Sequence, residues 1–114
     1  MRVLIVKLSS LGDVVHAMPV VHDIRSAFPQ ALIDWVVEPG FAPLVRRVDG
    51  IHFVIDCALR RWSKAWWTGA VRAEWRAFRL KLQATRYDAV LDLQGLTKSA
   101  LIARLAHGRS FGLA

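Results

Sequence analysis

The residues near the start of the chain that are best suited to chemistry lie in the run LSSLGDVVH, residues 8–16. An apolar, strand-like segment leads into it, and the run supplies the hydroxyl of Ser10 and the carboxylate of Asp13. Ser10 followed three residues later by an acid resembles a capping box, with aspartate in place of glutamate or glutamine. The alternative is a carboxylate held ionised beside backbone amides, able to take a proton from a substrate hydroxyl. The local residues alone favour capping.

The same run does not match two common nucleotide-binding motifs. It lacks the GxxxxGK[ST] spacing of a phosphate loop and the GxGxxG spacing of a dinucleotide fingerprint. The histidines, His16, His22, His52 and His107, have no metal-ligand spacing and no cysteine or acid cluster beside them. The sequence therefore predicts no metal site.

A second stretch with chemical potential is LRRWSKAWW, residues 59–67, which combines three bases with three tryptophans. Arginine pairs suit bidentate binding of carboxylate or phosphate, and tryptophan suits sugars, bases and the membrane interface. These residues leave a glycolipid, a nucleic acid and a membrane surface open as ligands. The alternative, slightly favoured by composition, places Trp66 and Trp67 in the core and leaves the charges in water.

Two further groups lie where strands are expected to end. Lys7 follows the first apolar run, and local sequence does not decide between a solvated lysine and a contact with an anion or hydroxyl. The run DLQGLTKSA places Asp92 at a strand end, and Thr97 can cap the next helix. Lys98 in the first helical turn opposes the helix dipole, which weakly indicates an anion nearby.

The elements that must position these groups alternate between strands and helices. Apolar, partly β-branched runs predict strands at residues 3–7, 31–37, 51–56 and 88–92. Apolar spacings of three and four predict a helix from Val14 that Pro19 kinks or restarts and Pro29 ends, and a longer helix from Thr68. A short helix at 41–47, a loop or irregular helix at 57–67 and a last helix at 97–106 complete the pattern.

This order predicts an α/β fold, a Rossmann-like parallel sheet with helices on both faces. Ligands of such sheets bind at the carboxyl ends of the strands. The stretches expected to converge on that rim are residues 7–13, 37–40, 56–64 and 92–98.

Composition sets the class of protein. The 114 residues are 54% apolar, enough for one core and too few for two ordinary domains. The sequence holds no apolar run near the ~20 residues that span a bilayer, and it shows no signal peptide and one cysteine, so an intracellular location is expected. Residues 57–86 hold eight bases against the single acid Glu74 and so carry the whole net charge of +7. Such a patch is typical of a surface that meets an anion.

Four stretches taken together resemble one family. They are VKLSSLGDVVHAMPV, IDWVVEPGFA, ALRRWSKAWW and YDAVLDLQGLTKSALIARLAHG. In this order and spacing they are similar to the N-terminal part of the lipopolysaccharide heptosyltransferases, and the RRWSKAW stretch favours the type I branch over type II. The resemblance runs over essentially the whole chain.

The resemblance implies a two-domain GT-B glycosyltransferase. Residues 1–114 would be a partial N-terminal acceptor-binding domain, with the C-terminal nucleotide-sugar-binding domain absent, so this part alone is expected to be inactive. The segment RSFGLA at the end of the chain, which reads as a strand just beginning, fits that expectation.

The resemblance also implies a reaction. Heptose would pass from ADP-heptose to the Kdo sugar of Kdo2-lipid A with inversion, in the biosynthesis of the lipopolysaccharide inner core. Asp13 would be the general base, and neither a metal nor another cofactor would be needed. Residues near Asp13 would position the acceptor, and three bases of the tryptophan-rich stretch would bind Kdo carboxylates and lipid A phosphates. The first set is Lys7, Ser9, Ser10, Gly12, Gln94 and Lys98, and the second is Arg60, Arg61 and Lys64.

Charge placement adds a location. Arg72, Arg76 and Arg79 share one face of the helix expected after Thr68 and could rest on the anionic inner leaflet. The expected protein is therefore cytoplasmic and peripheral on the cytoplasmic face of the inner membrane, with no nucleic acid partner. The competing hypothesis is a non-enzymatic module that binds RNA or an anionic membrane through residues 57–86. Against RNA, the segment lacks an aromatic nucleic-acid motif.

Overall fold

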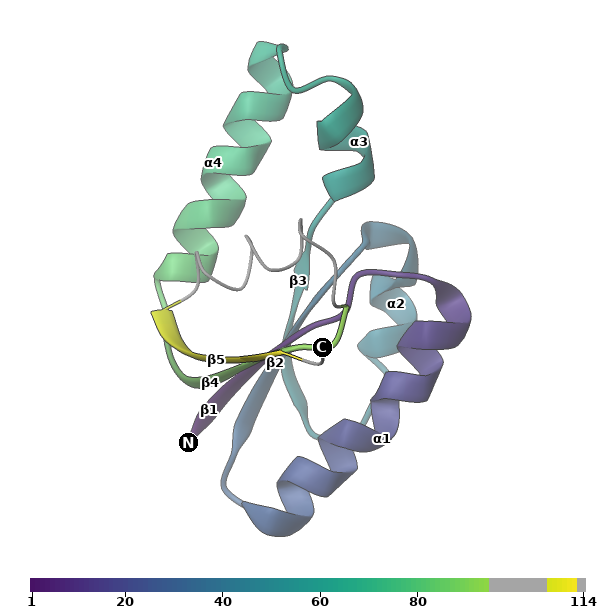
Figure 1. Ribbon diagram of the computed structural model, residues 1–114, viewed down its shortest axis with the longest axis vertical. Coiled ribbons are helices and arrows are strands. Elements are labelled where there is room, and N and C mark those ends of the chain that lie inside the picture. Colours follow the sequence, from purple (N-terminus) through teal and green to yellow (C-terminus); the bar gives the residue numbers. More distant parts are fainter. Residues whose placement is uncertain (95–106, 113–114) are drawn as a thin grey trace.

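A five-stranded parallel sheet forms the centre of the molecule (Figure 1). The computed structural model describes residues 1–94 with their side chains and the backbone of residues 107–112. The strands lie in the order β3-β2-β1-β4-β5. Their bounds are β1 Arg2–Val6, β2 Leu32–Val37, β3 Ile51–Asp56, β4 Arg86–Asp92 and β5 His107–Gly112. The predicted strands, the parallel sheet and the α/β class are confirmed.

Helices cover both faces of this sheet. Helix α1 (Leu11–Ala27) and the short helices η1 (Pro39–Phe41) and α2 (Ala42–Val45) lie on one face (Figure 1). Helices α3 (Leu59–Lys64) and α4 (Gly69–Gln83) rise together on the other. Two separate groups of buried residues result, one under each layer of helices.

The apolar runs explain this burial. In β1, Val3 and Ile5 face the α1 layer, whereas Leu4 and Val6 face the α4 layer, so a continuous apolar strand is buried on both sides. Helix α4 buries Val71, Phe78 and Leu82 along one face, and Thr68 caps it by accepting a hydrogen bond from the backbone N–H of Val71 at 3.3 Å. The helices thus close the faces and leave the strand ends open.

Three expectations about local structure need revision or lie outside the described residues. Helix α1 begins at Leu11 and continues through Pro19 without a restart. Residues 57–67 contain the regular helix α3. The last helix, predicted for residues 97–106, lies outside the described residues, while the strand expected near the end of the chain is present as β5 and begins at His107.

The placement of the tryptophans also differs from the slightly favoured interpretation, which put Trp66 and Trp67 in the core. Both are exposed, and Trp62 is the buried one. The Trp62 ring packs against Trp75 and Phe78, with ring centroids 5.8 and 5.4 Å away. A six-residue helix has one buried face, and Trp62 occupies it.

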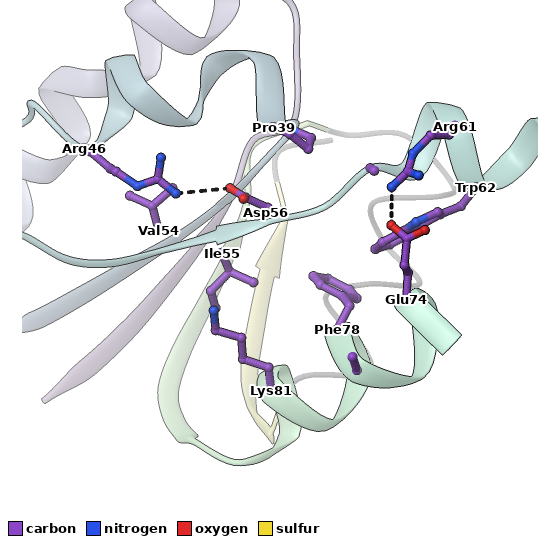
Figure 2. A pocket seen from close by; sticks show the side chains of 12 residues that line it. Pro39, Arg46, Val54, Ile55, Asp56, Arg61, Trp62, Glu74, Phe78 and Lys81 are labelled. Carbon is purple, nitrogen blue, oxygen red and sulfur yellow. Dashed lines mark hydrogen bonds and ion pairs between the residues drawn. The ribbon is translucent and has the colours of Figure 1, made fainter. Parts of the chain in front are cut away.

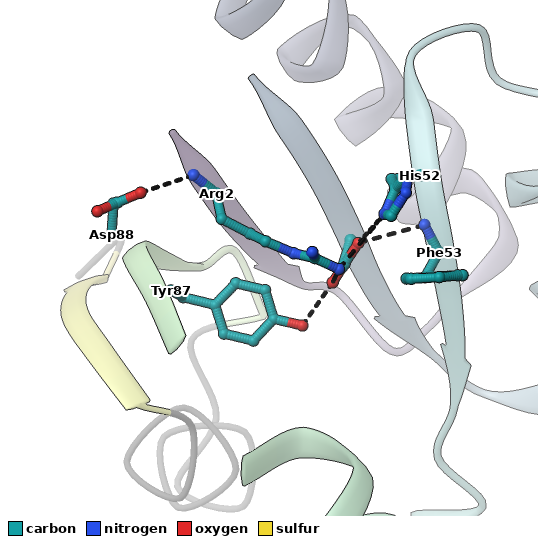
Figure 3. Close-up of polar contacts among 6 residues, drawn as sticks. Arg2, His52, Phe53, Tyr87 and Asp88 are labelled. Atoms are coloured by element: carbon teal, nitrogen blue, oxygen red, sulfur yellow. Dashed lines mark hydrogen bonds and ion pairs between the residues drawn. The ribbon is translucent and has the colours of Figure 1, made fainter. Parts of the chain in front are cut away.

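One polar cluster lies in the core near the amino ends of the strands (Figure 3). The carboxylate of Asp34, 1% exposed, accepts hydrogen bonds from the Tyr87 hydroxyl at 2.6 Å, the Arg2 guanidinium at 3.1 Å and the Phe53 N–H at 3.2 Å. His52 Nδ1 lies 3.6 Å from the same carboxylate. Burial, followed by the hydrogen bond to Asp34, raises the pKa of Tyr87 above its ordinary range, so the phenol stays protonated and donates. These residues join β1, β2, β3 and β4.

Candidate active site

The candidate site lies where the sheet changes direction. The chain leaves β1 over one face through α1 and returns to β4 over the other face through α3 and α4. The carboxyl ends of the neighbouring strands β1 and β4 therefore form a topological switch point, the place where ligands bind in open α/β sheets.

Hydrogen bonds hold the segments of this rim together. Gln94 Oε1 accepts from the backbone N–H groups of Leu8 at 3.0 Å and Ser9 at 3.3 Å. Lys7 Nζ donates to the Leu93 carbonyl at 3.1 Å, and the Glu38 N–H donates to the Leu8 carbonyl at 3.1 Å. The loops after β1, β2 and β4 thus meet, as their sequence positions predicted.

Asp13 lies in the first turn of α1 and is exposed. The Ser10 hydroxyl donates to Asp13 Oδ2 at 3.2 Å. Ser10 is the N-cap residue, but its side chain makes no capping hydrogen bond to the backbone, so the predicted capping box is not formed. The serine instead binds the acid. Apart from this contact, the Asp13 carboxylate is exposed to solvent in the described part of the chain.

Gly12 precedes Asp13 in the same turn, and a Cβ built there would meet no atom within 4 Å. Packing within the described part of the chain therefore does not require glycine at this position. A side chain at this position would therefore extend into open space.

A basic hollow of about 470 Å³ lies beside the rim, between the end of β2 and α3. Its cations are Arg60, Arg61 and Lys64, the three bases for which the family resemblance implied a role in binding acceptor anions. Glu38 also lines it and accepts from the backbone N–H of Arg60 at 3.2 Å, which fixes the first turn of α3 against β2. We refer to this site as the basic hollow.

A second hollow, of about 400 Å³, lies on the far side of Arg61 at the edge of β3 (Figure 2). Arg61 forms an ion pair with Glu74 of α4, and Arg46 forms another with Asp56 at 3.5 Å. Each of these arginines is therefore matched by an acid. The basic hollow carries the larger excess of positive charge, with three cations against one acid.

Cys57 directly follows β3 and is fully buried in the core on the α4 side of the sheet. Burial, with a smaller contribution from the nearby Glu38 carboxylate, raises the pKa of the Cys57 thiol to about 12. A thiol that stays protonated is a poor nucleophile, so Cys57 is a core residue and does not take part in covalent chemistry.

The structure divides the predicted site residues into three groups. Lys7, Ser9 and Gln94 form the hydrogen-bonded rim, Ser10 and Asp13 form a pair above it, and Arg60, Arg61 and Lys64 line the basic hollow. Asp13 is not among the residues that line the hollow. Lys98 lies outside the described residues.

Two residues were not assigned a role from sequence. Glu38 ties β2 to α3, and its signal is an acid directly after a buried strand. Glu74 pairs with Arg61, and its signal is that it is the single acid of the basic segment 57–86. Among the residues whose positions are described, three or more His, Cys, Asp or Glu side chains nowhere gather as a metal site would require. No helix in the described ranges has the length and apolar character to span a membrane.

Known proteins share both the sequence and the fold of this chain. The model of glycosyltransferase family 9 (heptosyltransferase) matches residues 75–114. Lipopolysaccharide heptosyltransferase 1 of Escherichia coli K12 is 53% identical over 99% of this chain and 36% of its own length. The protein of the same name from Pseudomonas aeruginosa is 47% identical over 91% of this chain and 29% of its own.

Solved structures agree. The E. coli heptosyltransferase WaaC with ADP superimposes with a TM-score of 0.95 at 53% identity, over 99% of this chain and 36% of that one. The E. coli ADP-heptose lps heptosyltransferase II gives a TM-score of 0.76 at 24% identity over 98% of this chain and 30% of that one, a likeness of fold alone. The chain spans between 29% and 36% of the length of these relatives. With its sequence matched end to end and its fold superimposed, the chain belongs to the heptosyltransferases of glycosyltransferase family 9.

Proposed function

We propose that this chain is the acceptor-binding part of a glycosyltransferase that moves heptose from ADP-heptose to the Kdo sugar of Kdo2-lipid A. The observation that carries the proposal is the position of Asp13. Its exposed carboxylate lies at the switch point of the sheet, in a chain similar throughout its length to lipopolysaccharide heptosyltransferase 1. The ADP-heptose site would lie mainly in a C-terminal domain beyond these residues.

Asp13 serves as the general base in this mechanism. Its carboxylate takes the proton from an acceptor hydroxyl while that oxygen attacks the anomeric carbon of heptose. The bond from that carbon to ADP breaks at the same time, ADP leaves with the bonding electrons, and the anomeric configuration inverts. A base positioned in this way contributes roughly 10²–10⁴-fold to the rate. The Ser10 hydroxyl, hydrogen-bonded to Oδ2, orients the carboxylate.

The basic hollow supplies the electrostatic part of acceptor binding. Kdo carries a carboxylate and lipid A carries phosphates, and arginine binds both groups through paired N–H donors. Arg60 and Lys64 are exposed at the mouth of the hollow, and Arg61 separates it from the hollow at the edge of β3. The acceptor headgroup would span from these cations to Asp13 along the rim.

The reaction would take place at the cytoplasmic face of the inner membrane. Arg72, Arg76 and Arg79 are exposed on α4, and anionic lipid attracts such bases by ~1 kcal/mol each near the surface. The exposed bases of α4 and the basic hollow belong to the same helical layer, which supports a shared orientation toward lipid.

The test uses a complete enzyme in which residues 1–114 replace the matching region of the E. coli relative. We expect Asp13→Asn, which keeps the shape and removes the base, to lower kcat by roughly 10²–10⁴-fold with little change in the acceptor KM. Asp23→Asn is the matched control, because Asp23 is another exposed acid of α1, and it should leave kcat unchanged. Transfer near the parental rate in the Asp13 variant would show that the base lies elsewhere.

A further inference from the structure

The connection between α3 and α4 exposes two adjacent tryptophans. Trp66 is 63% exposed and Trp67 is 61% exposed, and their rings meet edge to face with centroids 6.2 Å apart. We call this pair the aromatic tip. Tryptophans are rarely left so open to water without a partner, and a contiguous apolar surface of this kind marks an interaction site.

The aromatic tip continues into an apolar groove between the two helices. Trp66 lines this groove of about 260 Å³ with Leu59, Val71 and Trp75, and Arg72 stands at its margin. The groove extends the apolar surface from the tip toward the core, so an apolar partner would contact more than two isolated rings.

The tip is held rigidly. The Thr68 hydroxyl donates to the Ala65 carbonyl at 2.9 Å and caps α4, while the ion pair between Arg61 and Glu74 joins the two helices. Trp62 packs across the same pair of helices. A surface that is already ordered loses little conformational entropy on binding.

The charges around the tip select the partner. Lys64 and Arg72 flank it and are exposed, and Glu74, the single acid of residues 57–86, is paired with Arg61. A partner that is apolar at the centre and negatively charged around it matches an anionic lipid bilayer, where tryptophan concentrates at the interface. Single-stranded nucleic acid fits less well, because the two rings stand at 83° and offer no common face for successive bases.

We infer that the aromatic tip inserts into the interface of an anionic bilayer and fixes the orientation of the molecule on it. This inference rests on the proposed function only for the choice of a lipid surface. Attraction through the basic face of α4 would lay that helix flat on the membrane. Insertion of the tip instead orients α3 and α4 upright, with their connection in the lipid interface. Figure 1 shows the connection between them at one end of the longest axis, away from the N-terminus.

The upright orientation has a graded consequence along α4. Arg79 lies seven residues beyond Arg72, about 10 Å farther from the tip at 1.5 Å per residue. That distance is about one Debye length, so Arg72 should contribute to lipid binding much more than Arg79. A helix lying flat on the membrane would make the two arginines equal. The basic hollow, which Lys64 also lines, would lie close to the lipid headgroups.

The test is flotation of the complete enzyme described above with vesicles of phosphatidylcholine that contain phosphatidylglycerol. We expect Trp66→Ser/Trp67→Ser to weaken vesicle binding roughly tenfold or more, because two large apolar side chains leave the interface. The control Phe28→Ser/Leu80→Ser removes two apolar side chains of similar exposure, 49% and 60%, away from the tip and should keep the affinity. Trp67→Ser alone should show a smaller loss of vesicle binding, and it replaces the double variant as the test if that variant does not fold.

The charge variants discriminate the orientation. Arg72→Gln should weaken binding about fivefold, and Arg79→Gln should have little effect. Equal effects of the two substitutions, or unchanged binding of the tryptophan variant, would overturn insertion of the tip. So would displacement of the vesicles by single-stranded RNA at physiological salt.

The proposed function is tested apart from this inference with an acceptor whose acyl chains have been removed. The tryptophan variant should transfer heptose to this soluble acceptor at the parental rate, and lose transfer only with acceptor held in vesicles. Loss of transfer to both acceptors would assign the tryptophans to the reaction and overturn a role limited to the membrane. Parental enzyme that binds vesicles but transfers no heptose would refute the proposed function and leave the membrane contact standing.

Discussion

Asp13 and Asp34 are carboxylates at opposite ends of the same sheet, and their surroundings differ in kind. Asp34 is 1% exposed and accepts hydrogen bonds from a phenol, a guanidinium and a backbone N–H. Asp13 is exposed, and within residues 1–94 its carboxylate accepts a hydrogen bond from the Ser10 hydroxyl. One carboxylate is buried with three hydrogen-bond donors, and the other is exposed with one.

The difference separates a structural acid from one that can react. A buried carboxylate with several donors holds its neighbours in place, and its burial closes it to an incoming substrate. An exposed carboxylate in the first turn of a helix contributes little to stability but can accept a proton. The amino end of this sheet is therefore built for stability, and the carboxyl end is left open for chemistry.

The largest loss of stability should come from removing the buried carboxylate of Asp34. Asp34→Ala leaves the Arg2 guanidinium and the Tyr87 hydroxyl without their acceptor, and we expect the free energy of unfolding to fall by roughly 3–5 kcal/mol. Asp13→Ala should change it by no more than about 0.5 kcal/mol, because the side chain is exposed. Urea unfolding of the two variants measures both values. Equal losses would contradict the division of roles.

A smaller loss of stability should follow from removing one hydroxyl at each end of the sheet. Tyr87→Phe leaves a lone pair of the buried Asp34 unpaired, and we expect a loss of about 1–3 kcal/mol. Ser10→Ala removes the matching hydroxyl from the exposed Asp13 and should cost no more than about 0.5 kcal/mol. The same unfolding measurement compares the pair, and a Ser10 effect as large as that of Tyr87 would mean that Asp13 is tied into the fold.

The two ends also differ in how well sequence predicted them. The rim followed from apolar runs that mark buried strands, since the polar groups after each run must meet at one edge. The Asp34 cluster was missed because Arg2, Asp34 and Tyr87 lie far apart in sequence and have no common spacing. The single acid inside the apolar strand 32–37 was the available signal, since a buried charge requires a partner.

The exposure of tryptophans was harder to predict for a physical reason. The residues around Trp62 form a helix of six residues, which is too short for its apolar spacing to define a face. Only packing against Trp75 and Phe78 of α4 decides that Trp62 is buried while Trp66 and Trp67 stay exposed. Tertiary contacts, rather than local pattern, determine which tryptophan enters the core.

Gly12 offers a test with a small gain in stability. Its space is open and its φ is not positive, so Gly12→Ala should raise the free energy of unfolding by about 0.4–1 kcal/mol through the unfolded state. In the complete enzyme the same change should raise the acceptor KM if the acceptor approaches this turn, because Gly12 is adjacent to Asp13 at the start of α1. Gly69→Ala at the start of α4 is the control, since its space is also open and it lies away from the rim. An unchanged KM in both variants would mean that the acceptor does not approach Gly12.

The smallest effect at neutral pH is expected for the reactivity of Cys57. This reactivity tests whether the core next to the open rim is as inaccessible to solvent as the Asp34 cluster. Burial raises the pKa of its thiol from 9.0 to about 12, so the folded protein favours the protonated form. The stability from this preference is fully present below pH 9 and is lost as the pH rises from 9 toward 12. The single cysteine of the chain should therefore resist a thiol reagent at neutral pH and react only at the rate of unfolding. Rapid modification of the folded chain would show that α3 opens away from Glu38 and exposes Cys57.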